Sequence, residues 1–254
     1  MDKGSLNIEH IDREEKRIKR NSIQQTWLAL NKQGRLMIVR EYISRVVMAL
    51  ILFLISGNWR WQNAWLYFFF ALGSIILVHL TVVREDPQLY NERGTRHSDT
   101  KSWDNIILPL YALGGYLVLV VAALDERYGW SDLAPAWLAL GCVVMLFMEF
   151  LVITAMRANP FFSSTVRIQS ERGQQVMQRG PYAIIRHPGY AGGILYYLAS
   201  FGMLDSRWVL LPTLLTVSLI IARTNLEDKT LQKELDGYPA YAQKVRFRLF
   251  PGIW

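Results

Sequence analysis

The sequence contains one cysteine, Cys142, and four histidines in 254 residues. A single cysteine excludes a disulfide within the chain and a zinc cluster built from cysteines. None of the histidines has the spacing of a metal-binding pair, so we expect no metal centre. Charged residues are scarce at 19%, against about 25% in an ordinary soluble domain, while 52% of the residues are hydrophobic. This composition excludes a disordered chain and argues against an ordinary soluble enzyme.

Six apolar stretches are long enough, or nearly long enough, to cross a bilayer as helices. A span needs about 20 apolar residues, because a helix rises about 1.5 Å per residue and the hydrocarbon layer is about 30 Å thick. The stretches are 43–57, 64–83, 106–124, 133–156, 190–204 and 208–222. Only Asp205, Ser206 and Arg207 separate the last two, which predicts a tight helical hairpin. The sequence therefore predicts an all-α integral membrane protein with six transmembrane helices.

The basic residues alternate between the two sides of this arrangement. Of the 28 Lys and Arg residues, 24 lie before residue 43, in 84–104, in 157–187 or after residue 222, and only three lie in the intervening turns. Basic loops stay on the cytoplasmic side. We therefore expect both termini in the cytoplasm, at the inner membrane if the source is a prokaryote. The net charge of +7 then reflects membrane topology rather than nucleic-acid binding.

The chain divides into three parts on this basis. Residues 1–42 form a cytoplasmic or interfacial arm, in which Ile8, Ile11 and Ile18 lie near helical spacing. Residues 43–156 supply four helices, and residues 157–254 carry the unusual polar motifs. No cytoplasmic stretch exceeds 42 residues and there is no G-x-G-x-x-G, so a dinucleotide-binding fold has no room. A cofactor site on the cytoplasmic side must be assembled from helix ends and loops.

The first polar segment precedes the predicted hairpin and reads Gly-Pro-Tyr-Ala-Ile-Ile-Arg-His-Pro-Gly-Tyr from Gly180 to Tyr190. Pro188 suits the first turn of a helix, with His187 near the N-cap. The free N–H groups of such a helix start can hold a carboxylate or a polar heterocycle. Taken alone, the segment favours a structural loop and cap.

The second polar segment follows the hairpin and begins Arg223-Thr224-Asn225-Leu226-Glu227-Asp228. Arg223 and Glu227 are four residues apart, so they lie on one face of a helix. Two interpretations are open: an ion pair along the helix, or two charged groups lining a pocket near the membrane surface. Spacing alone favours the ion pair.

Together these motifs resemble the isoprenylcysteine carboxyl methyltransferase family. The pattern is Gly-Pro-Tyr, Arg-His-Pro-Gly-Tyr, Arg-x-x-x-Glu-Asp and Gly-Tyr-x-x-Tyr-x-x-x-Val-x-x-Arg-x-x-Pro, over roughly residues 157–254. Members of that family are integral membrane enzymes that transfer a methyl group from S-adenosylmethionine to the carboxylate of a lipid-like substrate. The resemblance implies that activity, cofactor and substrate class here, with the site facing the cytoplasm.

The resemblance also implies roles for individual residues. The implied cofactor-binding residues are Gln169, Gln174, Gln175, Val176, Met177, Tyr182, Arg186, His187, Pro188, Gly189, Tyr190 and Glu227. Arg223 matches an arginine that meets the substrate carboxylate, so Arg223 and Glu227 are the implied catalytic residues. The chain departs from the family at Gln174, where a histidine is usual, and at Asp228, where a second glutamate is common.

Three other functions stay open at this point. Methylation of a phospholipid amine requires a general base, for which Glu227 or His187 is the candidate. A nicotinamide-dependent reductase calls for more clustered Arg and Lys than residues 157–187 supply. A non-catalytic transporter usually has two pseudo-symmetric halves, which this sequence lacks. Glu149, within the fourth apolar stretch, is expected to make a structural polar contact.

Overall fold

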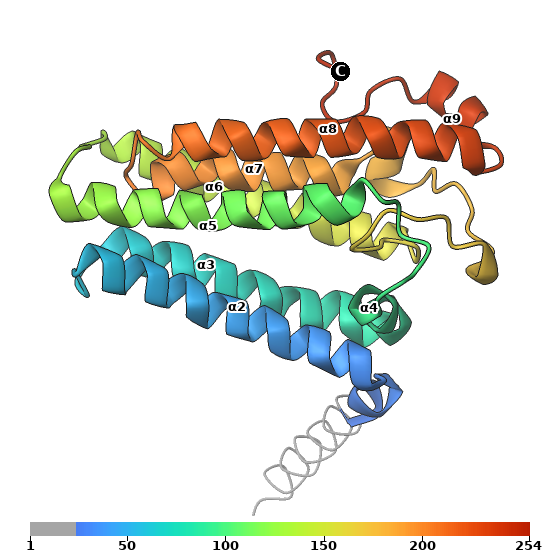
Figure 1. The fold of residues 1–254 in the computed structure, drawn as a ribbon, viewed down its shortest axis with the longest axis horizontal. Coiled ribbons are helices and arrows are strands. Elements are labelled where there is room, and N and C mark those ends of the chain that lie inside the picture. Colours follow the sequence, from blue (N-terminus) through green and yellow to red (C-terminus); the bar gives the residue numbers. More distant parts are fainter. Residues whose placement is uncertain (1–23) are drawn as a thin grey trace, which may run out of the picture.

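A computed structural model describes residues 24–254, which fold into six long helices lying side by side (Figure 1). They are α2 (Lys32–Ser56), α3 (Gln62–Val78), α5 (Asp104–Tyr128), α6 (Pro135–Ala158), α7 (Pro188–Met203) and α8 (Leu210–Glu234). One turn of π-helix, η1 (His79–Val83), extends α3. This part of the chain contains no β-strand, so the predicted all-α class is confirmed. Ile8, Ile11 and Ile18 lie outside the described residues.

Four of the helices are long and apolar enough to cross a membrane. These are α3 together with η1, α5, α6 and α8. The other two long helices fall short, α2 in apolar composition and α7 in length. The apolar part of α2 includes Arg40, Glu41 and Arg45, and α7 has only 16 residues. A 16-residue helix is about 24 Å long. The four helices support an integral membrane protein. The structure also runs α2 without a break across residue 42, the expected end of the N-terminal arm.

Successive long helices alternate in direction, and this gathers the polar segments at one end of the bundle (Figure 1). We call it the motif end; it comprises residues 84–103, 159–187 and 235–254. It contains α4 (Pro87–Gly94), the 3₁₀ turns η2 (Ser170–Arg172) and η3 (Gly180–Ala183), and α9 (Tyr238–Lys244). The opposite end has only the short connections 57–61, 129–134 and 204–209. Residues far apart in sequence therefore meet at the motif end.

The helix starts follow from the positions of proline. Pro188 is the first residue of α7 and His187 is its N-cap, as the sequence predicts. Pro135 begins α6 in the same way. Proline suits this position because its missing N–H would have no partner within the helix. Gly57 and Gly129 end α2 and α5 with φ of 68° and 62°, a left-handed conformation that favours glycine.

The predicted hairpin is present between α7 and α8. Its turn is fixed from the side by the α5–α6 connection: Asp205 Oδ1 accepts from the Leu133 N–H at 2.8 Å, and the buried Ser206 hydroxyl donates to Asp125. Ser131 Oγ also donates to Asp125, at 2.7 Å. These bonds tie the hairpin to α5 and hold α7 and α8 in register.

Glycine allows α7 to pack closely against α6. A Cβ at Gly202 would fall well inside van der Waals contact with the carbonyl oxygen of Trp137, and one at Gly141 would crowd Met203 and the carbonyl oxygen of Ala199. Small residues at such crossings let two helix backbones approach, which is a main source of helix association in membranes. The position of α7, and of the motif at its start, depends on this contact.

We expect Gly202→Ala to destabilise the protein by about 1–3 kcal/mol, because the added methyl group meets backbone that cannot rotate away. Gly73→Ala on α3 is the matched control, since a Cβ there has no neighbour within 4 Å. Thermal unfolding in detergent, followed by circular dichroism, measures both. Equal melting temperatures for the two variants would contradict the proposed close packing.

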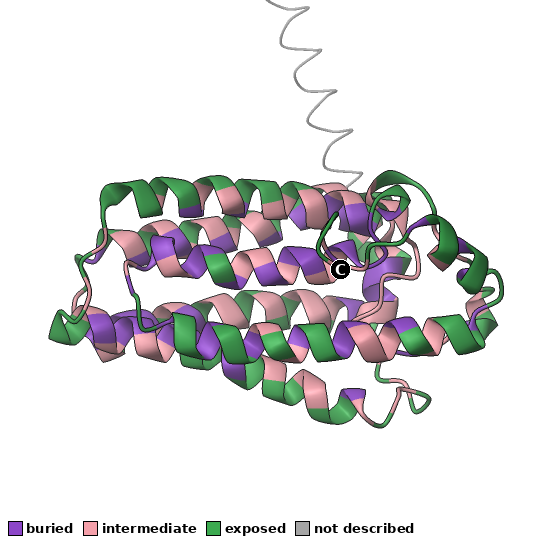
Figure 2. Ribbon diagram, turned by 90° about the horizontal axis from the view of Figure 1, so that it is seen from above, coloured by how far each residue is buried: buried purple, intermediate pink, exposed green. Residues whose placement is uncertain are grey.

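Exposed residues lie on the outer faces of the long helices, and buried residues lie mainly on the inward faces (Figure 2). Many of the exposed residues are large and apolar. The exposed set includes Val143, Leu146, Phe147 and Phe150 on α6, and Leu211, Leu214 and Leu215 on α8. Apolar surface on this scale is unfavourable in water and is matched to the hydrocarbon of a bilayer.

Candidate active site

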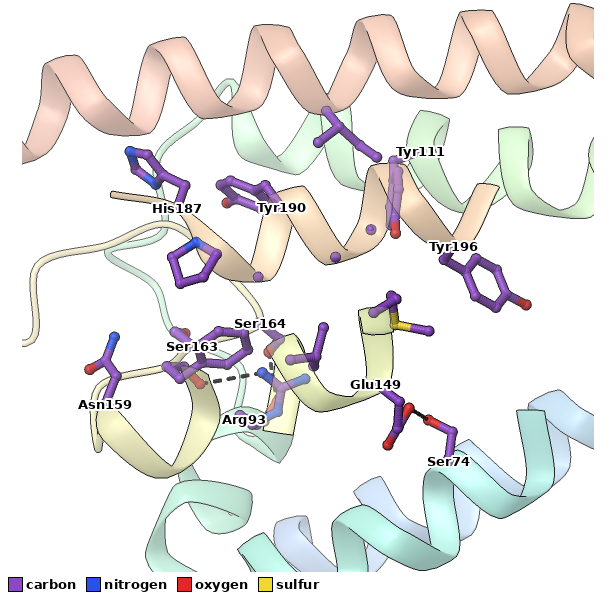
Figure 3. Close-up of a pocket in the computed structure, with 18 of the residues that line it drawn as sticks. Ser74, Arg93, Tyr111, Glu149, Asn159, Ser163, Ser164, His187, Tyr190 and Tyr196 are labelled. Atoms are coloured by element: carbon purple, nitrogen blue, oxygen red, sulfur yellow. Dashed lines mark hydrogen bonds between the residues drawn. The ribbon is translucent and has the colours of Figure 1, made fainter. Parts of the chain in front are cut away.

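A cavity of about 1200 Å³ runs from the motif end into the helix bundle. Its wall at the motif end comes from residues 159–177, from 182–190 and from the last turns of α8. Its inner wall comes from α2, α3, α5, α6 and α7 and is mainly apolar and aromatic. Figure 3 shows His187 and Tyr190 toward one side of this cavity and Glu149 and Ser74 toward the other. One continuous space therefore joins the polar motifs to the interior of the bundle.

Every residue to which the resemblance assigned a role lies on the wall of this cavity. The set is Gln169, Gln174, Gln175, Val176, Met177, Tyr182, Arg186, His187, Pro188, Gly189, Tyr190, Arg223 and Glu227. They come from three stretches of chain that are separate in sequence. The structure thus brings them together, although their individual roles remain predictions.

A hydrogen-bond network around Gln169 shapes the loop after α6. Gln169 is fully buried; its Nε2 donates to the Phe161 carbonyl at 2.9 Å, and its Oε1 accepts from Arg172 Nη1 at 2.5 Å. Its backbone N–H donates to Gln174 Oε1 at 2.7 Å. The amide groups of both glutamines therefore bond the protein and hold 174–177 against the cavity.

Tyr182 joins three parts of the motif end. Its hydroxyl accepts from Asn159 Nδ2 at 3.1 Å, and its carbonyl accepts from the Tyr241 hydroxyl at 2.7 Å. Burial raises the pKa of the Tyr182 phenol above its ordinary value, so this group stays protonated at neutral pH. Tyr182 can therefore donate its hydroxyl proton to a bound polar group.

The C-terminal tail closes over the start of α7. The N–H groups of Arg186 and His187 donate to the carbonyls of Phe247 and Arg248 at 3.0 and 2.9 Å. The Arg248 N–H in turn donates to the Trp254 carbonyl at 2.7 Å. These bonds satisfy backbone donors beside the helix start and fix the Arg-His-Pro motif in the cavity wall.

Asp228 is fully buried on α8 and gathers five donor side chains around one carboxylate. The partners are Arg186 (Nη2 3.2 Å), His187 (Nε2 3.2 Å), Gln232 (2.8 Å), Tyr238 (2.9 Å) and Arg248 (2.9 Å). The sequence interpretation treated Asp228 only as a replacement for a glutamate. The signal that could have found it was charge balance, because the neighbouring motifs supply Arg186, His187 and Arg248. Arg186 and His187 therefore contribute to the site at least partly by fixing its wall.

Arg223 forms an ion pair with Asp104, which the sequence interpretation did not single out. Nε and Nη2 of Arg223 lie 2.6 and 3.0 Å from the two oxygens of Asp104, and Nη2 also donates to the Ser164 carbonyl at 3.0 Å. Asp104 is fully buried and accepts from the Val166 N–H at 2.8 Å. This bidentate pair fixes the guanidinium at the cavity wall and leaves Nη1 as its remaining donor group.

Glu227 bonds the hydroxyl of Tyr190, and no ion pair joins it to Arg223 among the described residues. The Tyr190 ring lies beneath the Arg223 guanidinium, with 5.2 Å from the guanidinium carbon to the ring centroid. The ion pair along the helix, which spacing alone favoured, is therefore wrong. The second interpretation, two charged groups lining one cavity, matches the structure, with Tyr190 in contact with both.

Glu149 makes the polar contact expected of it and also lines the inner part of the cavity. Its Oε2 accepts from Ser74 Oγ at 2.5 Å, while Oε1 is buried without a hydrogen bond. Figure 3 shows this pair well apart from His187. The inner cavity is therefore mainly apolar, and the Ser74–Glu149 pair is one of its polar points.

Arg167 fastens the loop after α6 to the region of α4. Its guanidinium bonds Glu92, Glu171 (2.6 Å) and Asp99 (3.0 Å). Burial alone would lower the pKa of Arg167, but hydrogen bonds to these three carboxylates raise it above its ordinary value. Arg167 is thus a permanent cation whose charge is already compensated.

Comparison with known proteins identifies the part of the chain that carries this site. Residues 136–236, from the start of α6 to just beyond α8, match the phospholipid methyltransferase family. No match was found among curated proteins. The matched range contains the loop after α6, the Arg-His-Pro motif and the Arg223–Asp228 segment, but not Arg93, Asp104 or the C-terminal tail. The resemblance inferred from the motifs is confirmed at this level: the phospholipid methyltransferase family, which residues 136–236 match, is one of the isoprenylcysteine carboxyl methyltransferase-like families of integral membrane methyltransferases.

Proposed function

We propose that this protein is an integral membrane enzyme that transfers a methyl group from S-adenosylmethionine to a lipophilic acceptor, most simply a carboxylate. The observation that carries the proposal is the single cavity. It joins a polar site built from the motif segments to an apolar space among the helices. A water-soluble methyl donor and an apolar acceptor need such a two-sided site.

The proposal includes six spans, with the motif end in the cytoplasm. The support for α2 and α7 is that they lie beside the four apolar helices and alternate with them in direction (Figure 1). The segments of the motif end carry 11 Lys and Arg residues and the connections at the opposite end carry two, and basic segments stay on the cytoplasmic side. The site then faces the compartment that holds the cofactor, with both termini on the same side.

The residues at the motif end fit the proposed cofactor. Glu227 offers a carboxylate for ribose hydroxyls or for a sulfonium charge. Val176, Leu231 and Leu235 offer apolar contacts, and Gly189 presents backbone without a side chain beside the ring of Phe162. Bound there, S-adenosylmethionine supplies a methyl group carried on a positively charged sulfur.

The contribution of this chain is orientation rather than strong base catalysis. Asp104 and Tyr190 hold Arg223 in place, so that its free Nη1 can bind the acceptor carboxylate. The apolar inner cavity takes the lipid tail and excludes water from the reacting oxygen. Correct placement of two bound reactants accounts for much of the acceleration of such a displacement.

The second candidate is methylation of a phospholipid amine, which the family match favours. An amine must lose a proton before it attacks, so a base has to reach it. Glu227 suits this role better than His187, because His187 is buried against Asp228 and Tyr238.

A nicotinamide-dependent reductase is less well supported, because it calls for clustered basic residues. Four basic residues on the cavity wall are already paired with carboxylates, namely Arg167, Arg186, His187 and Arg223.

The pH dependence of methyl transfer separates the two acceptors. With tetradecanoate as acceptor we expect a rate that changes little between about pH 6.5 and 8.5, because a carboxylate is already ionised there. With phosphatidylethanolamine we expect a rise of about tenfold per pH unit, since the neutral amine fraction rises in that proportion below its pKa of about 10.

The assay uses S-adenosylmethionine with a tritiated methyl group, and the purified protein in detergent with each lipid. A methyl ester releases volatile tritiated methanol in mild base, whereas an N-methyl amine does not. Labelled ester would support the carboxylate proposal, and base-stable label in the phospholipid would support the second candidate. Label in neither of these, nor in a total lipid extract, would contradict both.

A further inference from the structure

Six basic side chains line the cavity, and most of them are neutralised by the protein. Arg167, Arg186, His187 and Arg223 each lie within 4.0 Å of a carboxylate oxygen. In the described part of the chain, Arg45 and Arg93 are the cavity-lining cations without such a partner. The cavity wall thus carries two arginines that have no carboxylate oxygen within 4.0 Å.

Of these two, Arg93 has the weaker bonds to the protein. Arg45 donates to the Ala71 carbonyl and to Ser44 Oγ, at 3.2 and 2.9 Å. Arg93 makes one long side-chain bond, from Nη1 to the Phe162 carbonyl at 3.3 Å, and its Nε is buried without a partner. A buried donor that lacks an acceptor is costly, and a guanidinium matches carboxylate and phosphate with two parallel bonds.

The groups next to Arg93 extend this polar point. Figure 3 shows Ser163 and Ser164 beside the Arg93 side chain. Ser164 Oγ donates to the Arg93 carbonyl at 2.8 Å, which holds the loop against the end of α4. Thr165 follows in the cavity wall, and its hydroxyl oxygen is also buried without a partner. Thr165 is thus three residues from Phe162 and one residue from Ser164, the two loop residues that bond Arg93, and both Arg93 and Thr165 have an unused donor.

This point lies close to the proposed reacting end. The Arg93 guanidinium lies over the Phe162 ring, at 5.3 Å from its centroid, and the same ring abuts Gly189. Arg93 donates to the carbonyl of residue 162 and Arg223 to that of residue 164. Two extended residues span at most about 7 Å. The two carbonyls are therefore no further apart than this, and both arginines contact the same short stretch of loop.

We propose that Arg93, with the Thr165 hydroxyl, binds the anionic group of the acceptor, so that the substrate is an anionic amphiphile. The inference rests on the proposed function, because it assigns the acceptor side of the same cavity. Arg93 lies on α4, outside the range that matches the family. The anion is either the reacting carboxylate, which Arg93 then binds together with Nη1 of Arg223, or a phosphate that holds a neighbouring amine at the reacting end.

Binding of three single-chain probes to the full-length protein in neutral detergent tests the proposal. Tetradecanoate and dodecyl phosphate carry the two anions, and dodecanol carries neither. We expect Arg93→Gln to weaken binding of the anionic probe that the wild type takes by at least about tenfold, the weight of a lost charged hydrogen bond. Dodecanol and S-adenosylhomocysteine should bind as before. Arg93→Lys should keep part of the anion affinity.

Arg96→Gln is the matched control, because Arg96 is exposed three residues further along and does not line the cavity. A preference of the wild type for tetradecanoate would identify the anion as a carboxylate, and a preference for dodecyl phosphate would identify it as a phosphate. Equal losses in Arg93→Gln and Arg96→Gln, or no preference for either anion over dodecanol, would overturn the proposal. If Arg93→Gln does not fold, two other variants test the proposal. It would be overturned if Thr165→Val kept full anion affinity and Arg93→Lys lost all of its anion affinity. Failure to bind S-adenosylhomocysteine concerns the proposed function alone, because the anions are measured without cofactor.

Discussion

Asp228→Asn should lower the free energy of unfolding by about 3–5 kcal/mol, the cost of removing one partner from a buried set of charges. The substitution keeps the shape of the side chain but leaves Arg186 and Arg248 facing each other without a counter-ion. The start of α7 and the C-terminal tail should then separate, since Asp228 bonds both. We expect a protease to cleave the tail faster, and we expect the protein to unfold at a lower concentration of denaturant.

Asp236→Asn is the control for this substitution. Asp236 is exposed and lies eight residues further on, and its substitution removes the same charge. Titration with SDS in mixed micelles, followed by circular dichroism, gives the unfolding free energy of each variant. If Asp228→Asn and Asp236→Asn had the same free energy of unfolding, the stabilising effect of the bonds around Asp228 would be contradicted.

Arg223→Gln should reduce methyl transfer by at least about 100-fold and also destabilise the protein. The activity falls because the acceptor loses a charged donor that the protein has fixed in position. The stability falls by about 3–5 kcal/mol because Asp104 is left fully buried without its partner. Adding Asp104→Asn should restore most of the stability but none of the activity, since it removes the unpaired buried charge but does not replace the donor that binds the acceptor.

The double variant therefore separates the two roles of Arg223. Recovery of activity together with stability would show that Arg223 is needed only for folding. Arg246→Gln serves as a charge control, because Arg246 is exposed on the C-terminal tail. Its methyl transfer should remain within about twofold of the wild type.

Most of the fold could be predicted from the sequence because it depends on local composition. The apolar runs 64–83 and 106–124 lie inside α3 with η1 and inside α5, and the run 133–156 is offset by two residues from α6. The last helix was underestimated: the expected span ends at residue 222, whereas α8 continues to Glu234. Its final turns are polar and lie over the motif end, where tertiary contacts rather than apolar length maintain the helix. α4 was missed because it has only eight residues and a polar composition.

The site could be predicted only in part, for a different reason. The motifs identified residues that face one cavity, but they did not show which charges pair. Arg223 and Asp104 are separated by 119 residues, so their contact follows from the crossing of α5 and α8 rather than from spacing. Arg186 and His187 were interpreted as cofactor contacts, yet each also bonds Asp228. For this reason a variant of Glu227 tests the cofactor site more cleanly than alanine at either of those two positions.

Calorimetric titration with S-adenosylhomocysteine tests whether the motif end binds the proposed cofactor. The wild type in detergent should bind it saturably at one site, and Glu227→Gln should bind at least about tenfold more weakly, because a carboxylate facing the ligand is lost. Glu234→Gln, two turns further along α8 and paired with Lys101 at the surface, should bind like the wild type. The proposed cofactor site would be contradicted if a folded sample showed no saturable binding, or if Glu227→Gln and Glu234→Gln bound equally. Binding of a nicotinamide dinucleotide instead would contradict it as well.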